Sequence, residues 1–243
     1  MRQQLLADNP AAGLLQRDLS VTEDKVGDAL LAQHDTQGAL ARYRDSLAIR
    51  SALVARFPSN KAWLRDLSVA HTKIGEVLLE NGDAAGAEIE YRADLSIAER
   101  LAGSDPHRTQ WQQDLSASHN NLGDALRKKG DLAGAIAEYR ADLAISEGLA
   151  GRDPSDAVSQ YDLSISHVSL ADALRDQGDV AEALQHYRAA LAIRQDVAAR
   201  APTNAEWRDG LAEIERAISA AGRAATGARP RPTRYAAASP GRE

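Results

Sequence analysis

Hydrophobic residues recur along the chain at intervals of three and four, which is the spacing of one face of an α-helix. Between Asn60 and Asn81 this stripe is formed by Trp63, Leu67, Ala70, Ile74, Val77 and Leu78. Gly82 ends it, and Asp83 can cap a following helix by accepting a hydrogen bond from a free amide of the first turn. A second stripe, which stops before Pro106, consists of Ala87, Tyr91, Leu95, Ala98 and Leu101. The pattern predicts two antiparallel helices joined by a short turn.

The whole pattern returns every 48 residues. Asp-Leu-Ser occurs at 18–20, 66–68, 114–116 and 162–164, and residues 65–112 and 113–160 are identical at 25 of 48 positions. A single helical hairpin cannot cover its apolar stripe, whereas stacked neighbours can. The sequence therefore predicts an all-α solenoid of stacked antiparallel helical hairpins.

The 48-residue offset also suggests how the chain is divided. Residues 5–18 align with 53–66, so we expect the chain to start inside the second helix of a preceding unit, as an excised piece of a longer protein or one that has lost its beginning. The expected divisions are a second-helix remnant (1–16), four repeats (17–64, 65–112, 113–160 and 161–203), a capping helix (204–222) and a disordered Arg/Pro tail (223–243).

Composition and charge narrow the function. The chain has no cysteine, which excludes disulfides, thiolate metal sites and cysteine nucleophiles. It also has no apolar run near the roughly 20 residues of a membrane span and no signal peptide, so we expect a cytoplasmic protein. The net charge is −6, and because the tail carries +4, residues 1–222 carry −10. This charge argues against nucleic acid as the main partner.

Candidate catalytic and metal-binding residues are few. His71, His119 and His167 recur in step, but neighbouring repeats lie roughly 10 Å apart, too far for shared metal ligation. We therefore expect these histidines to pack or to form hydrogen bonds between helices. Asp114 and Ser118 could be joined with His119 into a Ser-His-Asp set, but one exposed helix offers no oxyanion donors. We expect neither an enzyme nor a cofactor.

The middle of each unit resembles a tetratricopeptide repeat. The residues that carry the likeness in repeat two are Ile74-Gly75, Leu78, Gly82, Ala87 and Tyr91, and those in repeat three are Leu122-Gly123, Leu126, Gly130, Ala135 and Tyr139. Ala171 replaces the first-helix glycine in repeat four, and His34 replaces the inter-helix glycine in repeat one. The family repeat is normally 34 residues, so 14 are extra, about two turns for each helix. The units are similar to the elongated repeats of kinesin-light-chain-like proteins, and the resemblance implies a right-handed superhelix.

The resemblance also implies that the first helices line a concave partner-binding groove. The groove residues expected by position are Val21, Asp24, Asp28, Leu31, Val69, Thr72, Glu76, Leu79, Asn120, Asp124, Arg127, Val168, Asp172 and Arg175. Four of them, Asp28, Glu76, Asp124 and Asp172, form an acidic ladder. Such a groove is apolar and acidic at its N-terminal end and becomes mixed to basic near Arg127 and Arg175. Alternatively, the ladder pairs within the scaffold, for instance with Arg44, Arg92, Arg140 and Arg188.

Two functions are compatible with this sequence. The first is a protein-interaction scaffold that holds a peptide or partner segment in the groove, with a basic and apolar segment favoured at the N-terminal half. The second is a regulatory or oligomerisation region of a larger protein, which includes self-association through the open N-terminal edge. The fold alone cannot choose between them, because function depends on the site.

Overall fold

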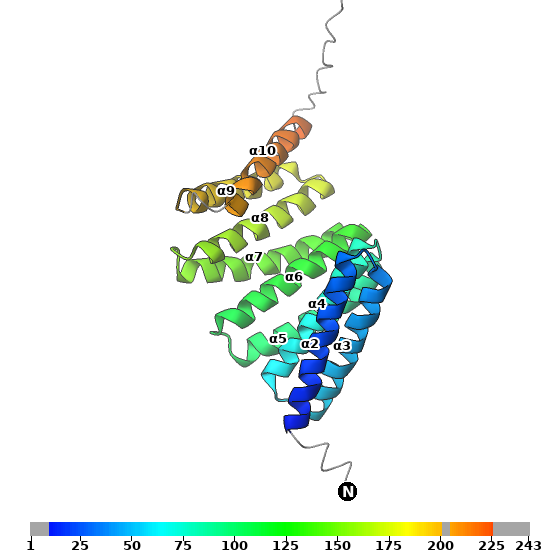
Figure 1. Ribbon diagram of the computed structural model, residues 1–243. Coiled ribbons are helices and arrows are strands. Elements are labelled where there is room, and N and C mark those ends of the chain that lie inside the picture. Colours follow the sequence, from blue (N-terminus) through cyan, green and yellow to red (C-terminus); the bar gives the residue numbers. More distant parts are fainter. Residues whose placement is uncertain (1–9, 201–204, 226–243) are drawn as a thin grey trace, which may run out of the picture.

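The computed structural model describes residues 10–200 and 205–225, and the regular structure in these ranges is helical throughout. The helices are α2 (Pro10–Ala32), α3 (Thr36–Arg56), α4 (Lys61–Glu80), α5 (Ala84–Ser104), α6 (Thr109–Lys129), α7 (Leu132–Arg152), α8 (Ala157–Gln177), α9 (Val180–Arg200) and α10 (Ala205–Ala225). Successive helices pack pairwise in series, so four hairpins stack from α2–α3 to α8–α9 and α10 packs on α9 (Figure 1). The all-helical solenoid predicted from the sequence is confirmed.

The second helix of each hairpin starts at a capping aspartate. The carboxylate accepts a hydrogen bond from the amide three residues later, at 2.9 to 3.0 Å for Asp35, Asp83 and Asp131. Just before the cap the backbone takes a positive φ, at Gly82, Gly130 and Gly178. His34 adopts φ 62° at the same place, a conformation that costs a residue with a side chain about 1–2 kcal/mol. The turn keeps its shape in the first hairpin although the glycine is missing.

A glycine on the first helix and a tyrosine on the second set how closely the helices of a hairpin approach. A Cβ atom on Gly75 would lie 2.5 Å from the Tyr91 ring, and one on Gly123 would lie 2.6 Å from the Tyr139 ring. Both tyrosines are fully buried. This contact explains why the Leu-Gly and Tyr positions of the repeat occur together.

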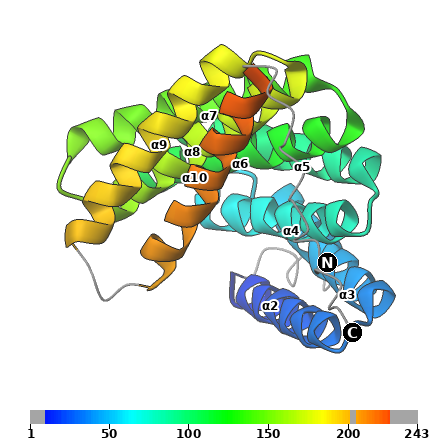
Figure 2. The same ribbon diagram turned by 90° about the horizontal axis from the view of Figure 1, so that it is seen from above.

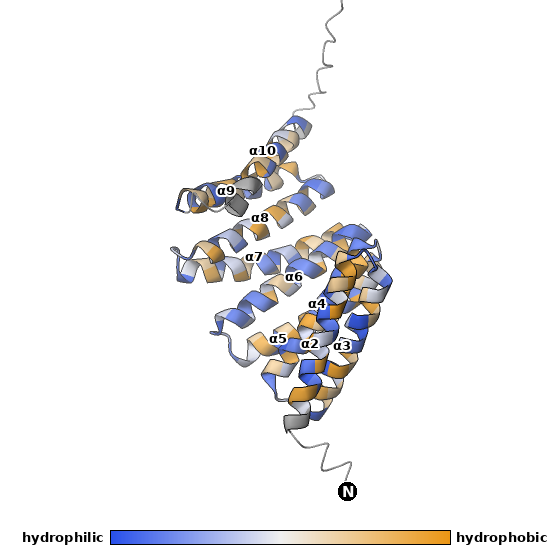
Figure 3. Cartoon of the chain, in the orientation of Figure 1, coloured by the Kyte–Doolittle hydropathy of each residue, from blue (hydrophilic) through white to orange (hydrophobic). Residues whose placement is uncertain are grey.

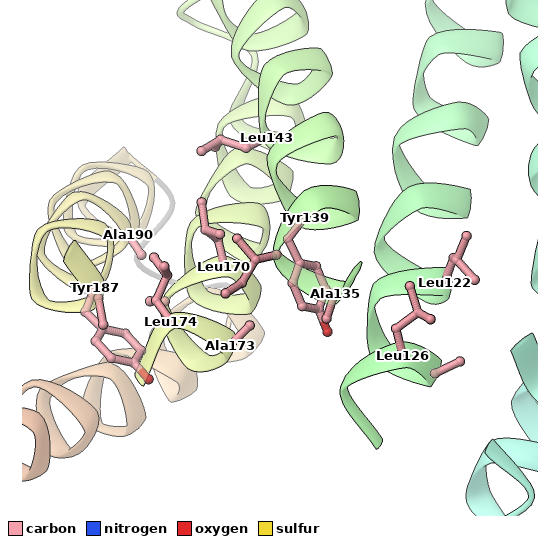
Figure 4. Close-up of a cluster of buried hydrophobic side chains, with 14 of the residues drawn as sticks. Leu122, Leu126, Ala135, Tyr139, Leu143, Leu170, Ala173, Leu174, Tyr187 and Ala190 are labelled. Carbon is pink, nitrogen blue, oxygen red and sulfur yellow. The ribbon is translucent and has the colours of Figure 1, made fainter. Parts of the chain in front are cut away.

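Small and aliphatic side chains fill most of the core. The largest cluster of buried residues extends from α5 to α10, and Figure 4 shows part of it, including Leu122, Leu126, Tyr139, Leu170 and Tyr187. Of the inner-face positions predicted for the second helix of repeat two, Leu95 is half-buried and the others are buried. Every helix carries hydrophobic and hydrophilic residues together (Figure 3), as expected for helices that bury one stripe.

The helices place the start of each hairpin earlier than the divisions expected from the sequence. The first helices start at Pro10, Lys61, Thr109 and Ala157, so the expected boundaries at 17, 65, 113 and 161 fall inside them. The period of 48 residues does not depend on where counting begins. The expected remnant and tail fall largely outside the described residues. Among the described helices, none is long and apolar enough to cross a membrane.

Candidate functional site

Three hollows open along the side of the array that is lined by the first helices, which we call the first-helix face. The α4–α6 hollow has a volume of about 320 Å³, the α6–α8 hollow about 380 Å³ and the α8–α10 hollow about 230 Å³. Each hollow is also lined by side chains of one second helix. This helix is α5 for the α4–α6 hollow, α7 for the α6–α8 hollow and α9 for the α8–α10 hollow. In the view from above, α9 and α10 lie in front and the α2–α3 pair lies at the lower right (Figure 2). The hollows thus follow the order of the repeats.

Seven of the predicted groove residues line these hollows. They are Val69, Thr72 and Glu76 in the α4–α6 hollow, Asn120 in the α6–α8 hollow, and Val168, Asp172 and Arg175 in the α8–α10 hollow. Leu31 and Leu79 instead pack against the hydrophobic core. Asp24 is buried beside Arg50, while Val21, Asp28, Asp124 and Arg127 lie outside the three hollows.

Three of the four carboxylates of the acidic ladder, those of Asp28, Asp124 and Asp172, accept a hydrogen bond from a tyrosine. Each hydroxyl donates within its own hairpin, from Tyr43 to Asp28 at 2.7 Å, from Tyr139 to Asp124 at 2.5 Å, and from Tyr187 to Asp172. Burial acts to raise the pKa of Asp28, but the bonds from Lys73 and Tyr43 outweigh it and hold that pKa below its ordinary value. Burial dominates at Asp124 and raises its pKa. The tyrosines therefore hold these three carboxylates within the scaffold.

The cations that pair with the ladder differ from those expected. Lys73 reaches Asp28 at 2.6 Å, and Arg127 and Arg175 reach Asp172 at 3.3 and 2.9 Å. Of the second-helix arginines suggested as partners, Arg92 pairs with Glu88 and Arg140 with Glu182. Arg92 and Arg140 are exposed on the second helices. The acidic ladder does form ion pairs within the scaffold, but its cationic partners lie on first helices. Arg127 and Arg175, expected where the groove becomes mixed to basic, are paired with Asp172 and Asp176.

The histidine ladder joins the two helices of the second, third and fourth hairpins. His71 lies 2.7 Å from Glu90, His119 lies 2.7 Å from Glu138, and His167 lies 3.0 Å from His186. Burial, together with the neighbouring His186, lowers the pKa of His167 to about 4. Among the described residues, no three His, Asp or Glu side chains converge as metal ligands would.

Asp114, Ser118 and His119, the possible Ser-His-Asp set, each bind a different partner. Ser118 is buried and donates to the main-chain carbonyl of Asp114 at 2.9 Å, whereas the Asp114 carboxylate binds Arg65. His119 is bonded to Glu138. Ser118 thus lies inside the array rather than on an exposed face. The three side chains form no proton relay.

A layer of buried polar side chains, which the sequence pattern did not predict, lies beneath the first-helix face. Asp94 accepts from Ser68, and Asp142 accepts from Ser116 and from Asn120, the latter at 3.1 Å. Burial raises the pKa of Asp94 despite its bonds from Ser68, Ser118 and Thr72. The signal was present in the repeats, because Ser46, Asp94, Asp142 and Ala190 occupy one position of the buried second-helix stripe. An acidic residue there breaks the apolar pattern.

Comparisons with known proteins agree with this architecture. Residues 116–156 and 168–198 match the family described as Tetratricopeptide repeat. BtubC (BKLC) from P. vanneervenii is similar in structure, with a TM-score of 0.59 and 16% identity over 99% of this chain and 93% of that one. The yeast histone chaperone Hif1 is also similar, with a TM-score of 0.51 and 16% identity over 84% of this chain and 94% of that one. No curated protein matches in sequence.

At such low identity the structural likeness shows the fold alone. The family match covers two of the repeated segments, and the rest of the array repeats their hairpin with the same capping aspartates and buried tyrosines. The family match shows that residues 116–156 and 168–198 carry tetratricopeptide repeats, and the other hairpins of the array have the same helical architecture.

Proposed function

We propose that this array is a protein-interaction scaffold that holds an extended or helical segment of a partner along the first-helix face. Tetratricopeptide arrays are typically scaffolds rather than enzymes, and stacked repeats provide extended surfaces for such segments. The observation that carries the proposal is the row of hollows, since pockets in series suit the successive side chains of one segment. Exposed apolar side chains, Val69 and Ile165, stand at two of these hollows.

A basic and apolar segment fits this face best. The α4–α6 hollow is lined by the carboxylates of Glu76, Asp94 and Asp114, and the α6–α8 hollow by those of Asp114, Asp142 and Asp162. The acidic lining therefore extends over the hollows from α4 to α8. Opposite charges across an interface favour encounter and suppress wrong partners.

The proposal is tested by blocking the two middle hollows. The double variant Val69→Arg and Ile165→Arg adds bulk and positive charge where a basic segment would lie, and both positions are exposed enough to accept the change. Partners captured from the native lysate by the full chain are identified by mass spectrometry, and their affinities are then measured by calorimetry. We expect the double variant to bind at least ten-fold more weakly, since each change opposes both packing and charge.

A matched control is Ile89→Arg, because Ile89 is an exposed apolar residue on α5 outside the hollows. It should bind like the unaltered chain. Circular dichroism establishes that all variants keep their helices. Equal affinities for the double variant and the control would show that the first-helix face is not the binding surface.

A second candidate function is a regulatory or oligomerisation region, and the surface of α2 favours it. Leu15, Leu19 and Val26 lie on one stripe of this helix and are all exposed. One repeat later the same positions are Trp63, Leu67 and Ile74, which are buried where α4 packs on the preceding hairpin. The exposed stripe thus has the chemistry of a helix-packing surface, and light scattering on variants of it separates self-association from monomeric partner binding.

A further inference from the structure

Arginines of this chain fill the space beneath the first-helix face at both ends of the array. Arg50 is buried, and its guanidinium binds the Ser20 hydroxyl at 3.1 Å, the Asp66 carbonyl at 2.7 Å and the Asp24 carboxylate. In the fourth hairpin Arg194 is buried in the equivalent position and binds the Ser164 hydroxyl at 3.0 Å. A guanidinium is therefore a natural occupant of this part of the repeat.

The two middle repeats lack that arginine. The residues equivalent to Arg50 and Arg194 are Ala98 and Ser146. Ser146 lines the α6–α8 hollow. One turn earlier on the same helices, an aspartate replaces the neutral residue of the end repeats, Asp94 in one and Asp142 in the other. The middle repeats thus carry an internal anion where the end repeats carry an internal cation.

A second arginine is missing at the α6–α8 hollow. Arg17 binds Asp66 at 2.5 Å across neighbouring first helices, and Arg65 binds Asp114 in the same way at 2.6 Å. At the next step Gln113 stands in the arginine position, and the carboxylate opposite is Asp162. Burial and the charges of Asp156 and Asp142 raise the pKa of Asp162. The α4–α6 hollow, by contrast, is already lined by Arg65 and Lys73.

The environment of Asp142 has the character of an unfilled cation site. This aspartate is 3% exposed, and its hydrogen-bond partners among the described residues are all neutral: Ser116, Asn120 and Ser146. A buried carboxylate is costly unless a counter-charge is supplied. The hollow of about 380 Å³ lies within the range of about 300–1,000 Å³ that small-molecule sites occupy.

We propose that the α6–α8 hollow receives an arginine side chain of the bound partner, whose guanidinium takes the place of the missing arginines and lies against Asp142 and Asp162. Arginine suits the site better than lysine, because its planar fork of donors can bind two carboxylates and nearby hydroxyls together. The inference rests on the proposed function and names the anchor of the partner segment. It also accounts for the two carboxylates, Asp142 and Asp162, that line this hollow.

The test uses N-acetyl-arginine methylamide as the probe and the citrulline analogue, which has the same shape without the charge, as its control. Binding to the isotope-labelled full chain is followed by amide chemical shifts. The arginine probe should produce saturable shifts at Ser116, Ser146 and Ser166, and the citrulline probe should bind at least ten-fold more weakly, since charged hydrogen bonds are the stronger ones.

Three variants locate the site. Ser146→Arg supplies the arginine from the chain itself, so it should raise the melting temperature and abolish the probe shifts; Asp142→Asn should weaken probe binding at least ten-fold. Glu147→Gln removes a carboxylate from an exposed position of the same helix and should bind the probe normally. Equal binding of both probes, or unchanged shifts in the Ser146→Arg and Asp142→Asn variants, would overturn the inference.

A peptide-display selection on the full chain separates this inference from the proposed function. Selected peptides that bind the first-helix face but tolerate replacement of arginine by citrulline would contradict the arginine anchor and leave the scaffold function intact. The opposite result, a specific arginine probe site with no peptide binding to this face, would contradict the scaffold function alone. Selected peptides that share an arginine, and that bind the Asp142→Asn variant at least ten-fold more weakly than the unaltered chain, would support both the arginine anchor and the scaffold function.

Discussion

At the scale of single residues, a glycine in the first helix sets the spacing between the two helices of a hairpin, because it has no methyl side chain. In Gly123→Ala the new Cβ would lie 2.6 Å from the Tyr139 ring, so the ring or the helix must move. We expect a loss of about 1–3 kcal/mol in the free energy of unfolding, measured by urea denaturation. The fourth hairpin shows that this strain can be accommodated, because Ala171 is buried at the equivalent position.

The control is a glycine in the same hairpin with open space around it. A Cβ on Gly148 would meet nothing within 4 Å, so Gly148→Ala should stabilise the protein by up to about 1 kcal/mol through helix propensity. The two substitutions should therefore act in opposite directions. A loss of similar size in both variants would mean that the tyrosine contact does not control the packing.

The contact between His167 and His186 predicts a loss of stability in mild acid. The pKa of His167 is about 4 in the folded chain and about 6.5 in the unfolded chain, so between these values only the unfolded chain binds the proton. Stability is then complete above pH 6.5 and falls as the pH decreases towards 4. We expect His167→Asn to show a shallower fall of the urea midpoint over this range. Parallel curves for the two proteins would exclude the histidine pair as the cause.

At the scale of helices, the sequence predicts where an element ends better than what its side chains touch. The first helix of repeat two was expected from about Asn60 to Asn81, and α4 extends from Lys61 to Glu80 with those two residues as its caps. Such ends are local events, since glycine and aspartate act on their own turn. They can therefore be recognised without knowledge of the neighbouring helices.

Partners across helices depend on distances that periodicity does not contain. The resemblance to the tetratricopeptide repeat placed Asp124 and its equivalents on one face, but it could not show that the Tyr139 hydroxyl, on the adjacent helix, donates to this carboxylate. The buried Asp142 was missed for a related reason, because an aspartate in a helix is normally exposed. Only the comparison of equivalent positions, arginine in the end repeats and serine or alanine in the middle ones, points to its role.

At the scale of the whole molecule, the exposed stripe of α2 predicts concentration-dependent association. If two copies pack through this stripe, light scattering should show a mass that rises with concentration, and Leu15→Glu with Leu19→Glu should return the chain to a monomer. Ile89→Glu, which adds the same charge on the exposed surface of α5, should leave association unchanged. A chain that stays monomeric at every concentration would exclude self-association through α2.

The missing arginines also suggest how such an array could acquire a different binding partner through mutation. Every unit presents the same two positions to its neighbour, and neither belongs to the glycine–tyrosine contact or to the capped turns that hold the hairpin together. Under the proposed arginine anchor, recognition and architecture depend on different residues of one repeated unit. Two codon changes within a unit, at the positions of Gln113 and Ser146, could open or close a binding pocket while the stack around it stays as it is.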